Sequence, residues 1–299
     1  MARIHLLTPV HRPAWSWPWR FALGTGLIAN VFFFAFSLVA LSARTVRQPV
    51  TKLDSVLSRG RLRVGCPLDY APFALRCSTG NTVRAMGSDI DAVVKLADSL
   101  GVTVDIVPTT WAQIVQDAPS FDMAVGGISP TLARRRYVGF SREYLSGGKV
   151  IVARCGSPLL NLSPSALNVP SVRAVVNLGG TNERFVRQAL PHAHLAIVSS
   201  NGDQFAVVAN LTADMTVTDR VEAELQAFRQ PELCAGRELL TEDTKAFMLP
   251  RDDYAWANYV NSFVSEWLES GNANSSMSRW LMAWGSNQSF CEAGVVIDR

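Results

Sequence analysis

The chain has 299 residues, 48% of them hydrophobic, so it can bury one large or two moderate cores and is not a disordered chain. Its formal net charge is only +3 and it has no long basic run, which argues against nucleic acid as a partner. The five cysteines show neither CxxC nor Cys/His metal-ligand spacing. We therefore expect no metal and no cofactor, and at least one thiol that is free or paired outside the chain.

The N-terminal region is predicted to be a signal or a membrane anchor. Residues 21–43 carry no charge, are long enough to span a bilayer and follow a basic flank of Arg3, Arg12 and Arg20. An uncleaved anchor and a cleaved signal both stay open, because Ala40-Leu-Ser42 resembles a small-residue cleavage site. In either case we expect the rest of the chain to be periplasmic or otherwise extracytoplasmic, with the membrane as a partner of the N-terminal segment.

From residue 53 onward the hydrophobic pattern alternates between helix and strand. In the first half it predicts a helix at 53–59, a strand at 61–66, a helix at 88–100, a strand at 102–107, a helix through 114 and 115, and strands at 121–125 and 149–153. In the second half it predicts strands at 172–176, 195–198, 215–219 and 246–249, and helices from about 181, at 204–209, at 221–228 and over 254–284. Apolar strands that alternate with helices indicate an α/β fold.

Two αβ units joined by two crossing strands describe a bilobed molecule whose cleft is lined by strand ends. The predicted domains are a signal or anchor at 1–44, a first lobe formed by 45–153 and 246–284, a second lobe at 154–245 and a flexible tail at 285–299. Ligands of open α/β sheets collect at the carboxyl ends of strands. The cleft is therefore the expected site for a small molecule.

Two strand ends carry candidate anion-binding residues. One of the arginines in Gly126-Gly-Ile-Ser-Pro-Thr-Leu-Ala-Arg-Arg-Arg136 is expected to bind an anion, because guanidinium recognises carboxylate with two hydrogen bonds. The segment Asn177-Leu-Gly-Gly-Thr-Asn-Glu-Arg-Phe185 starts a helix with Thr181 or Asn182 as its cap, so Glu183 lies beside free backbone N–H groups that favour anions. A solvated arginine face and a solvated first-turn glutamate remain the alternatives.

Seven segments carry a family resemblance. They are Asp69-Tyr-Ala-Pro-Phe73, Pro108-Thr-Thr-Trp111, Gly127-Ile-Ser-Pro-Thr-Leu-Ala-Arg134, Asn177-Leu-Gly-Gly-Thr-Asn-Glu183, Thr218-Asp-Arg-Val-Glu-Ala223, Pro231-Glu-Leu-Cys-Ala235 and Lys245-Ala-Phe-Met-Leu-Pro-Arg-Asp252. In this order they resemble periplasmic solute-binding proteins of the polar amino-acid class, and within that class the cyclohexadienyl (prephenate/arogenate) dehydratases. The resemblance covers about residues 53–284 and implies a periplasmic-binding-protein-like fold of two lobes.

The resemblance implies a carbon–oxygen lyase that converts prephenate to phenylpyruvate, or arogenate to phenylalanine, by loss of water and carbon dioxide. It implies Glu183 as the general acid, Arg134 as the ligand of a substrate carboxylate, and Lys245 as an ammonium that pairs with a carboxylate or steadies Glu183. Asp219 matches the position that receives the ammonium of amino-acid ligands. The remaining implied contacts are the polar residues Ser129, Thr131, Thr181 and Asn182 and the walls Trp111 and Tyr70.

Three positions depart from the family pattern: Pro130, Leu178 and Arg220. A salt bridge from Arg220 to Asp219 would take that carboxylate away from a substrate amine and favour prephenate over arogenate. The second hypothesis is a non-catalytic binding protein for an amino acid or organic acid in transport or sensing. It needs the same fold but no proton donor, so Glu183 and Lys245 separate the two hypotheses.

The two crossover strands also predict one disulfide. Cys155 follows the outgoing strand and Cys234 precedes the returning one. Both should lie in the second lobe near the hinge, within disulfide reach of each other. A Cα separation well beyond about 7 Å would exclude this pair.

Overall fold

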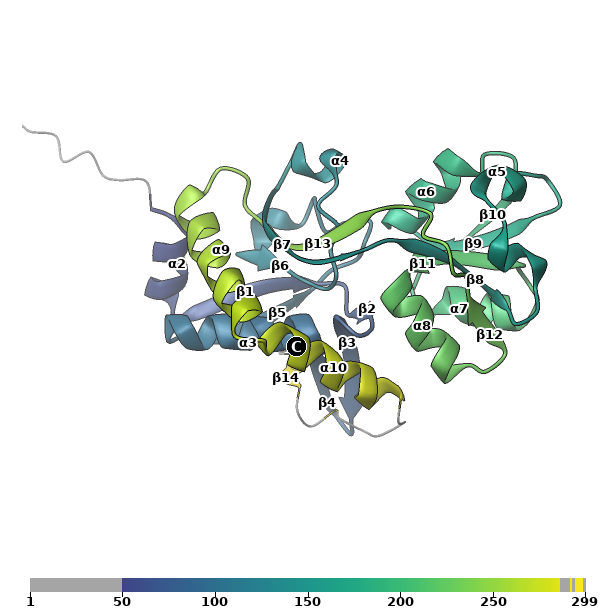
Figure 1. Ribbon diagram of the computed structural model, residues 1–299. Helices are drawn as coiled ribbons and strands as arrows, with labels where there is room; N and C mark the ends of the chain where they lie inside the picture. The colour runs from purple at the N-terminus through teal and green to yellow at the C-terminus, as the bar shows by residue number, and fades with distance from the viewer. Residues whose placement is uncertain (1–49, 286–290, 292–293, 298–299) are drawn as a thin grey trace, which may run out of the picture. The chain divides into compact units, whose positions relative to one another are not determined.

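The computed structural model describes residues 50–285, 291 and 294–297. The predicted signal or anchor at 21–43 lies outside these residues. Within the described ranges no helix is both long and apolar enough to cross a membrane. Figure 1 shows two lobes, each built on a five-stranded sheet with helices packed against it, as predicted for a bilobed α/β fold.

The first lobe is organised around a sheet of strand order β5-β1-β6-β13-β7. Its strands are β1 (Arg61–Cys66), β5 (Thr103–Pro108), β6 (Met123–Ala124), β7 (Gly139–Gly147) and β13 (Asp243–Leu249). β1 pairs in parallel with β5 and β6, whereas β13 runs antiparallel to β6 and β7. The helical segments of this lobe are α2 (Lys52–Arg59), α3 (Ser88–Leu100), η1 (Ala118–Ser120), α4 (Leu132–Arg135), α9 (Tyr254–Glu269) and α10 (Asn272–Gly285).

Local signals determine where the first two helices begin and end. Thr51 and Asp54 form a capping box at the start of α2, and Gly60 ends the helix in the left-handed conformation with φ of 66°. α3 buries Ile90 and Leu96 in the main core of the lobe, and it ends at Gly101 in the same conformation. The helices predicted at 53–59 and 88–100 are therefore confirmed.

The second lobe has a sheet of strand order β10-β9-β11-β8-β12. Its elements are β8 (Lys149–Arg154), η2 (Pro158–Asn161), α5 (Pro164–Leu167), β9 (Arg173–Asn177), α6 (Thr181–Ala189), β10 (His194–Val198), α7 (Asp203–Ala209), β11 (Met215–Asp219), α8 (Arg220–Arg229) and β12 (Leu233–Ala235). Val150 and Val152 of β8 face one hydrophobic cluster, whereas Ile151 and Ala153 face another. Because both faces of this sheet are covered, β8 reads as a continuous apolar run.

The two lobes are joined where β7 passes into β8 and where β12 leads to β13 (Figure 1). β8 belongs to the second sheet from Lys149 onward, and β13 belongs to the first sheet from Asp243 onward. The boundaries expected at 153/154 and 245/246 therefore differ from the sheets by a few residues. A Cβ on Gly148 would lie 1.9 Å from the carbonyl oxygen of Thr241, so glycine lets the two connections pass close together.

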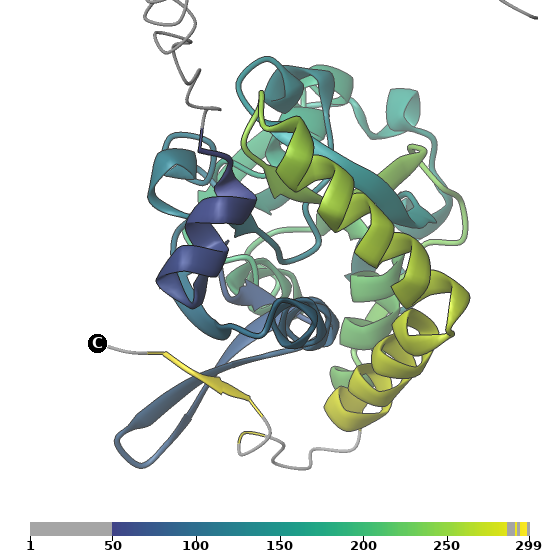
Figure 2. The same cartoon turned by 90° about the vertical axis from the view of Figure 1, so that its left-hand side faces the viewer.

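A third sheet, of order β14-β4-β3-β2, was not predicted. It consists of β2 (Asp69–Tyr70), β3 (Ala74–Thr79), β4 (Thr82–Met86) and β14 (Val295–Val296). Figure 2 shows β14 lying against the β3–β4 hairpin, and the Cys77–Cys291 disulfide, with a Cα–Cα distance of 5.5 Å, ties the same two segments together. The structure thus differs from the flexible tail expected at 285–299, because residues 294–297 are paired to the first lobe.

The predicted disulfide between Cys155 and Cys234 is confirmed, with a Cα–Cα distance of 4.9 Å. It lies where β8 and β12 pair, at the end of β8 opposite Lys149, so the pairing was predicted correctly but its expected place near the hinge was wrong. Cys66 is buried and unpaired, and burial raises the pKa of its thiol. The second lobe therefore has a covalent link between the end of β8 and β12, away from the hinge.

The helix predicted through residues 114 and 115 is wrong. Residues 111–117 form turns, with the N–H of Asp117 donating to the carbonyl of Gln113 and the hydroxyl of Thr109 donating to the carboxylate of Asp117. Pro108 and Pro119 bracket the segment, so an apolar stretch of helical spacing is too short here to propagate. The turns bring Trp111 to the lobe junction.

Candidate functional site

A cavity lies between the lobes, where strand ends of both sheets meet. Its lining is shared between the lobes and is mostly polar: Tyr70, Trp111, Gly127, Ser129, Arg134, Asn177, Gly180, Thr181, Asn182, Asn201, Asp219 and Lys245. All the predicted site residues except Glu183 and Thr131 line it. The cavity volume is about 20 Å³, and one water needs roughly 10–15 Å³. A larger ligand therefore enters only when the lobes separate.

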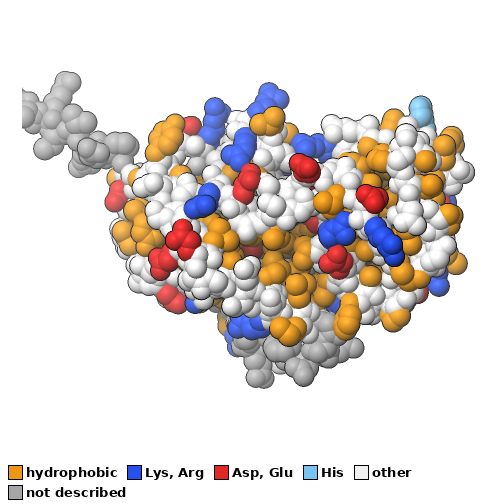
Figure 3. Space-filling view, in the orientation of Figure 1, with side chains coloured by type: hydrophobic (Ala, Val, Ile, Leu, Met, Phe, Trp, Pro, Cys, Tyr) orange, Lys and Arg blue, Asp and Glu red, His pale blue; other side chains and the backbone are white. Residues whose placement is uncertain are grey.

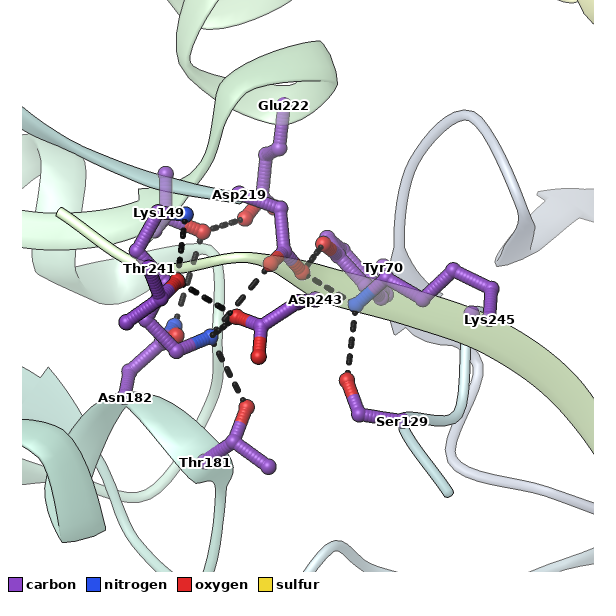
Figure 4. A network of polar contacts seen from close by, with 12 residues as sticks. Tyr70, Ser129, Lys149, Thr181, Asn182, Asp219, Glu222, Thr241, Asp243 and Lys245 are labelled. Atoms are coloured by element: carbon purple, nitrogen blue, oxygen red, sulfur yellow. Dashed lines mark hydrogen bonds and ion pairs between the residues drawn. The ribbon is translucent and has the colours of Figure 1, made fainter. Parts of the chain in front are cut away.

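Asp219, at the end of β11, is the centre of the polar network drawn in Figure 4. Its Oδ2 accepts hydrogen bonds from the Tyr70 hydroxyl and from Lys245 Nζ, and its Oδ1 lies 3.3 Å from Lys149 Nζ. Burial opposes ionisation of Asp219, but the two lysines outweigh burial and hold the pKa of this carboxyl below its usual range. Tyr70 and Lys245 belong to the first lobe and Asp219 to the second, so these contacts cross the cleft.

The salt bridge expected between Arg220 and Asp219 is wrong. The Arg220 guanidinium lies 3.7 Å from the carboxylate of Glu224, and it donates a hydrogen bond of 2.5 Å to the carbonyl oxygen of Arg237. The reason is local, since Arg220 starts α8 and its side chain follows the helix surface to the residue one turn later. Lys245 and Lys149 take the place that the sequence assigned to Arg220.

Lys245 reaches the cavity from β13, the strand that returns to the first lobe. Its Nζ donates to Ser129 Oγ at 3.0 Å and to Asp219, and it lies 5.6 Å from the centroid of the Tyr70 ring. Burial lowers the pKa of Lys245, and the neighbouring Asp219 opposes this shift. Lys245 is thus a buried cation facing the cavity, at the position where the sequence predicted one.

Lys149 was missed by sequence reasoning and is more deeply buried than Lys245. Its side chain is 2% exposed, and its Nζ donates to Thr181 Oγ1 at 2.9 Å and pairs with Asp219 at 3.3 Å and Asp243 at 3.4 Å. The signal was present, because a lysine that opens an otherwise apolar strand must find buried partners. In the antiparallel register Lys149 lies opposite Asp219, which is where a partner would be sought.

Arg134 faces the cavity from α4. Its guanidinium donates to the carbonyl of Ser129 at 3.1 Å and lies 5.9 Å from the Trp111 ring centroid. Burial lowers its pKa to about 10, and the positive charge of Arg184 contributes. Within the part of the chain that the structure describes, no carboxylate forms an ion pair with Arg134. This guanidinium is therefore available to an anionic ligand, and Thr131 caps the helix that carries it.

Glu183 lies in the first turn of α6 but points along the helix rather than into the cavity. Its Oε2 accepts the backbone N–H of Gly179 at 2.7 Å, and its Oε1 pairs with Arg187 at 2.8 Å. The N-cap of the helix is Gly180, which has no side chain to cap it, so Thr181 and the neighbouring asparagine are first-turn residues and not caps as predicted. Their positions at the helix N-terminus put free backbone N–H groups beside the cavity.

Gly179 allows the lobes to approach each other. It has φ of +76°, and a Cβ built on it would lie 2.5 Å from the Cα of Ala112 in the first lobe. Any other residue would therefore push the Trp111–Ala112 backbone away. This explains why the turn before α6 needs glycine, for steric as well as conformational reasons.

A second polar chain crosses the cleft beside the first. Trp111 Nε1 donates to Asp69 Oδ1 at 2.8 Å, and the backbone N–H of Asn201 donates to Asp69 Oδ2 at 3.0 Å. The Asn201 amide donates in turn to Glu222, which also accepts the Thr218 hydroxyl. Burial raises the pKa of Glu222 well above its usual value. Glu222 therefore supports the loop of Asn201 through these two hydrogen bonds.

The described charged side chains on the face of the molecule in Figure 3 form no continuous basic surface. On the face drawn in Figure 3, basic and acidic side chains are interspersed. Within the described residues no group of three or more His, Cys, Asp or Glu side chains could hold a metal ion. The arrangement is that of a closed site for a small molecule, with hydrogen-bond donors from both lobes.

Sequence comparisons identify relatives of this chain. The sequence profile of the bacterial extracellular solute-binding proteins, family 3, matches residues 62–283. Cyclohexadienyl dehydratase of Pseudomonas aeruginosa is 36% identical over 238 residues, which cover 78% of this chain and 87% of that protein. The L-cystine-binding protein TcyJ of Escherichia coli is 22% identical over 223 residues, covering 73% of this chain and 82% of its own.

Solved structures that resemble this chain come from the same kinds of protein. An ancestral amino-acid-binding protein, described as a precursor of cyclohexadienyl dehydratase, has a TM-score of 0.71 and 30% identity, covering 77% of this chain and 100% of its own. A mutant of ArgBP from T. maritima has a TM-score of 0.70 and 25% identity, and the match covers 77% of this chain and 99% of that protein. Binding proteins and a dehydratase lineage thus share this architecture.

Proposed function

We propose that this chain, which belongs to the bacterial extracellular solute-binding proteins of family 3, is a cyclohexadienyl dehydratase acting on prephenate, arogenate or both. The observation that carries the proposal is the pair of cations, Arg134 and Lys245, that faces one cavity beside the first turn of α6. A ligand with carboxylates would meet a guanidinium, an ammonium and free backbone N–H groups there. The 36% identity to a dehydratase supports the same assignment.

The proposed reaction needs one proton. The bond from the ring to the hydroxyl breaks as the hydroxyl takes up the proton and leaves as water. The bond from the ring to its carboxylate breaks as carbon dioxide leaves, and its electron pair completes the aromatic ring. Since aromatisation supplies the driving force, the protein has to orient the carboxylates and deliver the proton.

Glu183 is the proposed proton donor, and it has to turn toward the cavity to act. Its ion pair with Arg187 spans one helical turn, and the arginine is 58% exposed, so losing the pair costs only about 0.3–0.5 kcal/mol. The hydrogen bond from Gly179 to the charged carboxylate contributes about 1.5–3 kcal/mol. Protonation weakens both interactions, so the neutral acid is the form that is freed to turn.

A second candidate is a non-catalytic binding protein for an amino acid or organic acid. The position of Glu183 favours it, because a carboxylate bound to Gly179 and Arg187 outside the cavity plays no part in chemistry. Relatives such as TcyJ and ArgBP bear the names of binding proteins. In this reading Arg134 holds the ligand carboxylate and the lobes close over an unchanged ligand.

One experiment separates the two candidates. The purified full chain is incubated with prephenate, and the absorbance of phenylpyruvate is followed over time. Continuous formation of phenylpyruvate above the rate without protein supports the dehydratase. Saturable binding of prephenate or an amino acid, measured by calorimetry, with no product supports the binding protein.

A further inference from the structure

The cavity contains one carboxylate, and that carboxylate is already occupied. Asp219 is the only acidic side chain among the described residues that line the cavity. Its Oδ2 is bound by Lys245 and Tyr70, and its Oδ1 by Lys149. An α-ammonium group of a ligand would therefore have to compete with two lysines for the same two oxygens.

The two lysines are held in place independently of Asp219. Lys149 also pairs with Asp243 at 3.4 Å and donates to Thr181 at 2.9 Å, while Lys245 donates to Ser129 at 3.0 Å. Both lie on paired strands and are nearly inaccessible, with side chains 2% and 6% exposed. Lys149 lies in the same lobe as Asp219 and stays beside it when the lobes separate, whereas Lys245 returns to Asp219 when they close. In the closed site neither ammonium can turn into solvent to make room, because leaving its partners would leave a buried charge unpaired.

The charge balance favours an anion without an amine. Arg134 and Lys245 line the cavity against Asp219, and Lys149 adds a further cation behind it that Asp243 offsets. The cavity surface thus keeps one uncompensated positive charge, at Arg134, before a ligand binds. A ligand ammonium would add another positive charge near Lys245, whereas a keto oxygen in the same place would accept a hydrogen bond.

We infer that this cavity selects 2-oxo acids over the corresponding 2-amino acids, so that prephenate rather than arogenate is the substrate. The inference rests on the proposed function for the identity of the substrate, but the discrimination itself is a property of Asp219 and its two lysines. It also applies if the protein only binds its ligand. An Asp at this strand end can receive the amine of a ligand only where no lysine already occupies its carboxylate. In this chain Lys149 and Lys245 occupy it, so the same Asp disfavours an amine.

The test compares kcat/KM for prephenate and arogenate in the wild type, in Lys149→Met and in the control Lys95→Met. Lys95 is an exposed lysine on α3, away from the cavity. We expect the wild type and Lys95→Met to prefer prephenate at least tenfold. Lys149→Met frees Oδ1 of Asp219, so arogenate gains and the preference falls about tenfold. Equal use of both substrates by the wild type, or an unchanged preference in Lys149→Met, would overturn the inference.

A binding measurement separates this inference from the proposed function. Phenylpyruvate and L-phenylalanine differ only in the 2-oxo and 2-amino groups, and their dissociation constants are measured by calorimetry on the full chain. Tighter binding of phenylpyruvate, with the gap narrowed in Lys149→Met, supports the inference even if prephenate is not turned over. Tighter binding of phenylalanine, or binding of neither, contradicts it. If Lys149→Met does not fold, Lys149→Arg keeps the charge and should keep the preference.

Discussion

The carboxylate of Asp69 in the first lobe accepts the backbone N–H of Asn201 in the second lobe at 3.0 Å. The same carboxylate accepts the indole N–H of Trp111, which lines the cavity. One side chain therefore links closure of the lobes to the orientation of a cavity wall. Burial raises the pKa of Asp69, and the two hydrogen bonds oppose this shift, so the link is strongest when Asp69 is ionised.

Replacing Asp69 by Asn tests this link. Asn offers one oxygen and one NH₂ group, so its NH₂ group must face either the indole N–H of Trp111 or the backbone N–H of Asn201. That N–H group then has no acceptor, at a cost of about 1–3 kcal/mol in stability of the closed state. We expect phenylpyruvate to bind roughly tenfold more weakly, as measured by titration calorimetry. The exposed Asp252→Asn is the control. Unchanged affinity in Asp69→Asn would show that closure does not depend on this contact.

Gly179→Ala should hold the lobes apart. The new Cβ would lie 2.5 Å from the Ala112 Cα across the cleft, in addition to the cost of φ at +76°. Gly156→Ala is a matched control, because Gly156 has φ of +82° with open space around its Cβ position. Both variants should lose about 1–2 kcal/mol of folding stability.

Only the cavity-side variant should lose function. We expect small-angle scattering to show a larger radius of gyration for Gly179→Ala with ligand present, together with loss of ligand binding, whereas Gly156→Ala binds normally. Normal binding by both variants would mean that the Gly179–Ala112 approach is not part of the binding-competent state.

Asp89 gives a prediction about pH. Burial raises its pKa to about 6, although the N–H groups of Gly126 and Gly127 and the Tyr144 hydroxyl bind its Oδ2 and oppose the shift. A carboxyl with a raised folded-state pKa contributes stability below its unfolded pKa of about 3.9, and that contribution is lost as pH rises toward 6. The loss is on the order of 2–3 kcal/mol.

Asp89→Asn imitates the protonated acid, since it is uncharged and its oxygen can take the place of Oδ2, which faces the three donors. We expect the variant to match the wild type in free energy of unfolding near pH 4 and to exceed it by about 2–3 kcal/mol at pH 7. Urea unfolding at both pH values measures this, with the exposed Asp98→Asn as control. A variant less stable than the wild type at pH 7 would show that ionisation of Asp89 does not lower the free energy of unfolding.

The Cys77–Cys291 disulfide should hold β14 against β4. Replacing both cysteines by Ser is expected to lower folding stability by about 2–4 kcal/mol and to speed amide hydrogen exchange in β4, which pairs with β14 at Ala85 and Arg84. Removing Cys155 and Cys234 instead should leave exchange in β4 unchanged. Equal exchange of β4 in both double variants would contradict a local role for the first disulfide.

Most regular elements could be predicted because their signals are local. Gly60 and Gly101 end helices where an αL residue is needed, and the apolar run 150–153 belongs to a sheet covered on both faces. The β3–β4 hairpin was missed because its strands are half-exposed and carry Arg76 and Arg84, so they lack a clear alternating pattern. Its pairing with β14 depends on contacts more than 200 residues apart, as in the hydrogen bond from Arg84 to the Gly294 carbonyl, with a separation of 210.

Most of the predicted site residues line the cavity, but the contacts between them were not predicted. Arg134, Lys245 and Asp219 came from strand-end positions and resemblance, and the structure brings them to one cavity. The partner of Asp219 was misjudged because sequence proximity favoured Arg220, whereas Lys149 is adjacent only through the antiparallel register of β8 and β11. Rotamers such as that of Glu183 depend on neighbours in space and cannot be read from a motif.

The most direct test of the account compares prephenate turnover by the wild type, Glu183→Gln and Arg187→Gln. If Glu183 delivers the proton, the wild type forms phenylpyruvate, and Glu183→Gln lowers kcat by about 10²- to 10⁴-fold while prephenate still binds. Arg187→Gln removes only the ion pair that holds Glu183 outside the cavity, so it should stay active. No phenylpyruvate from the wild type, or full activity in Glu183→Gln, would contradict the account.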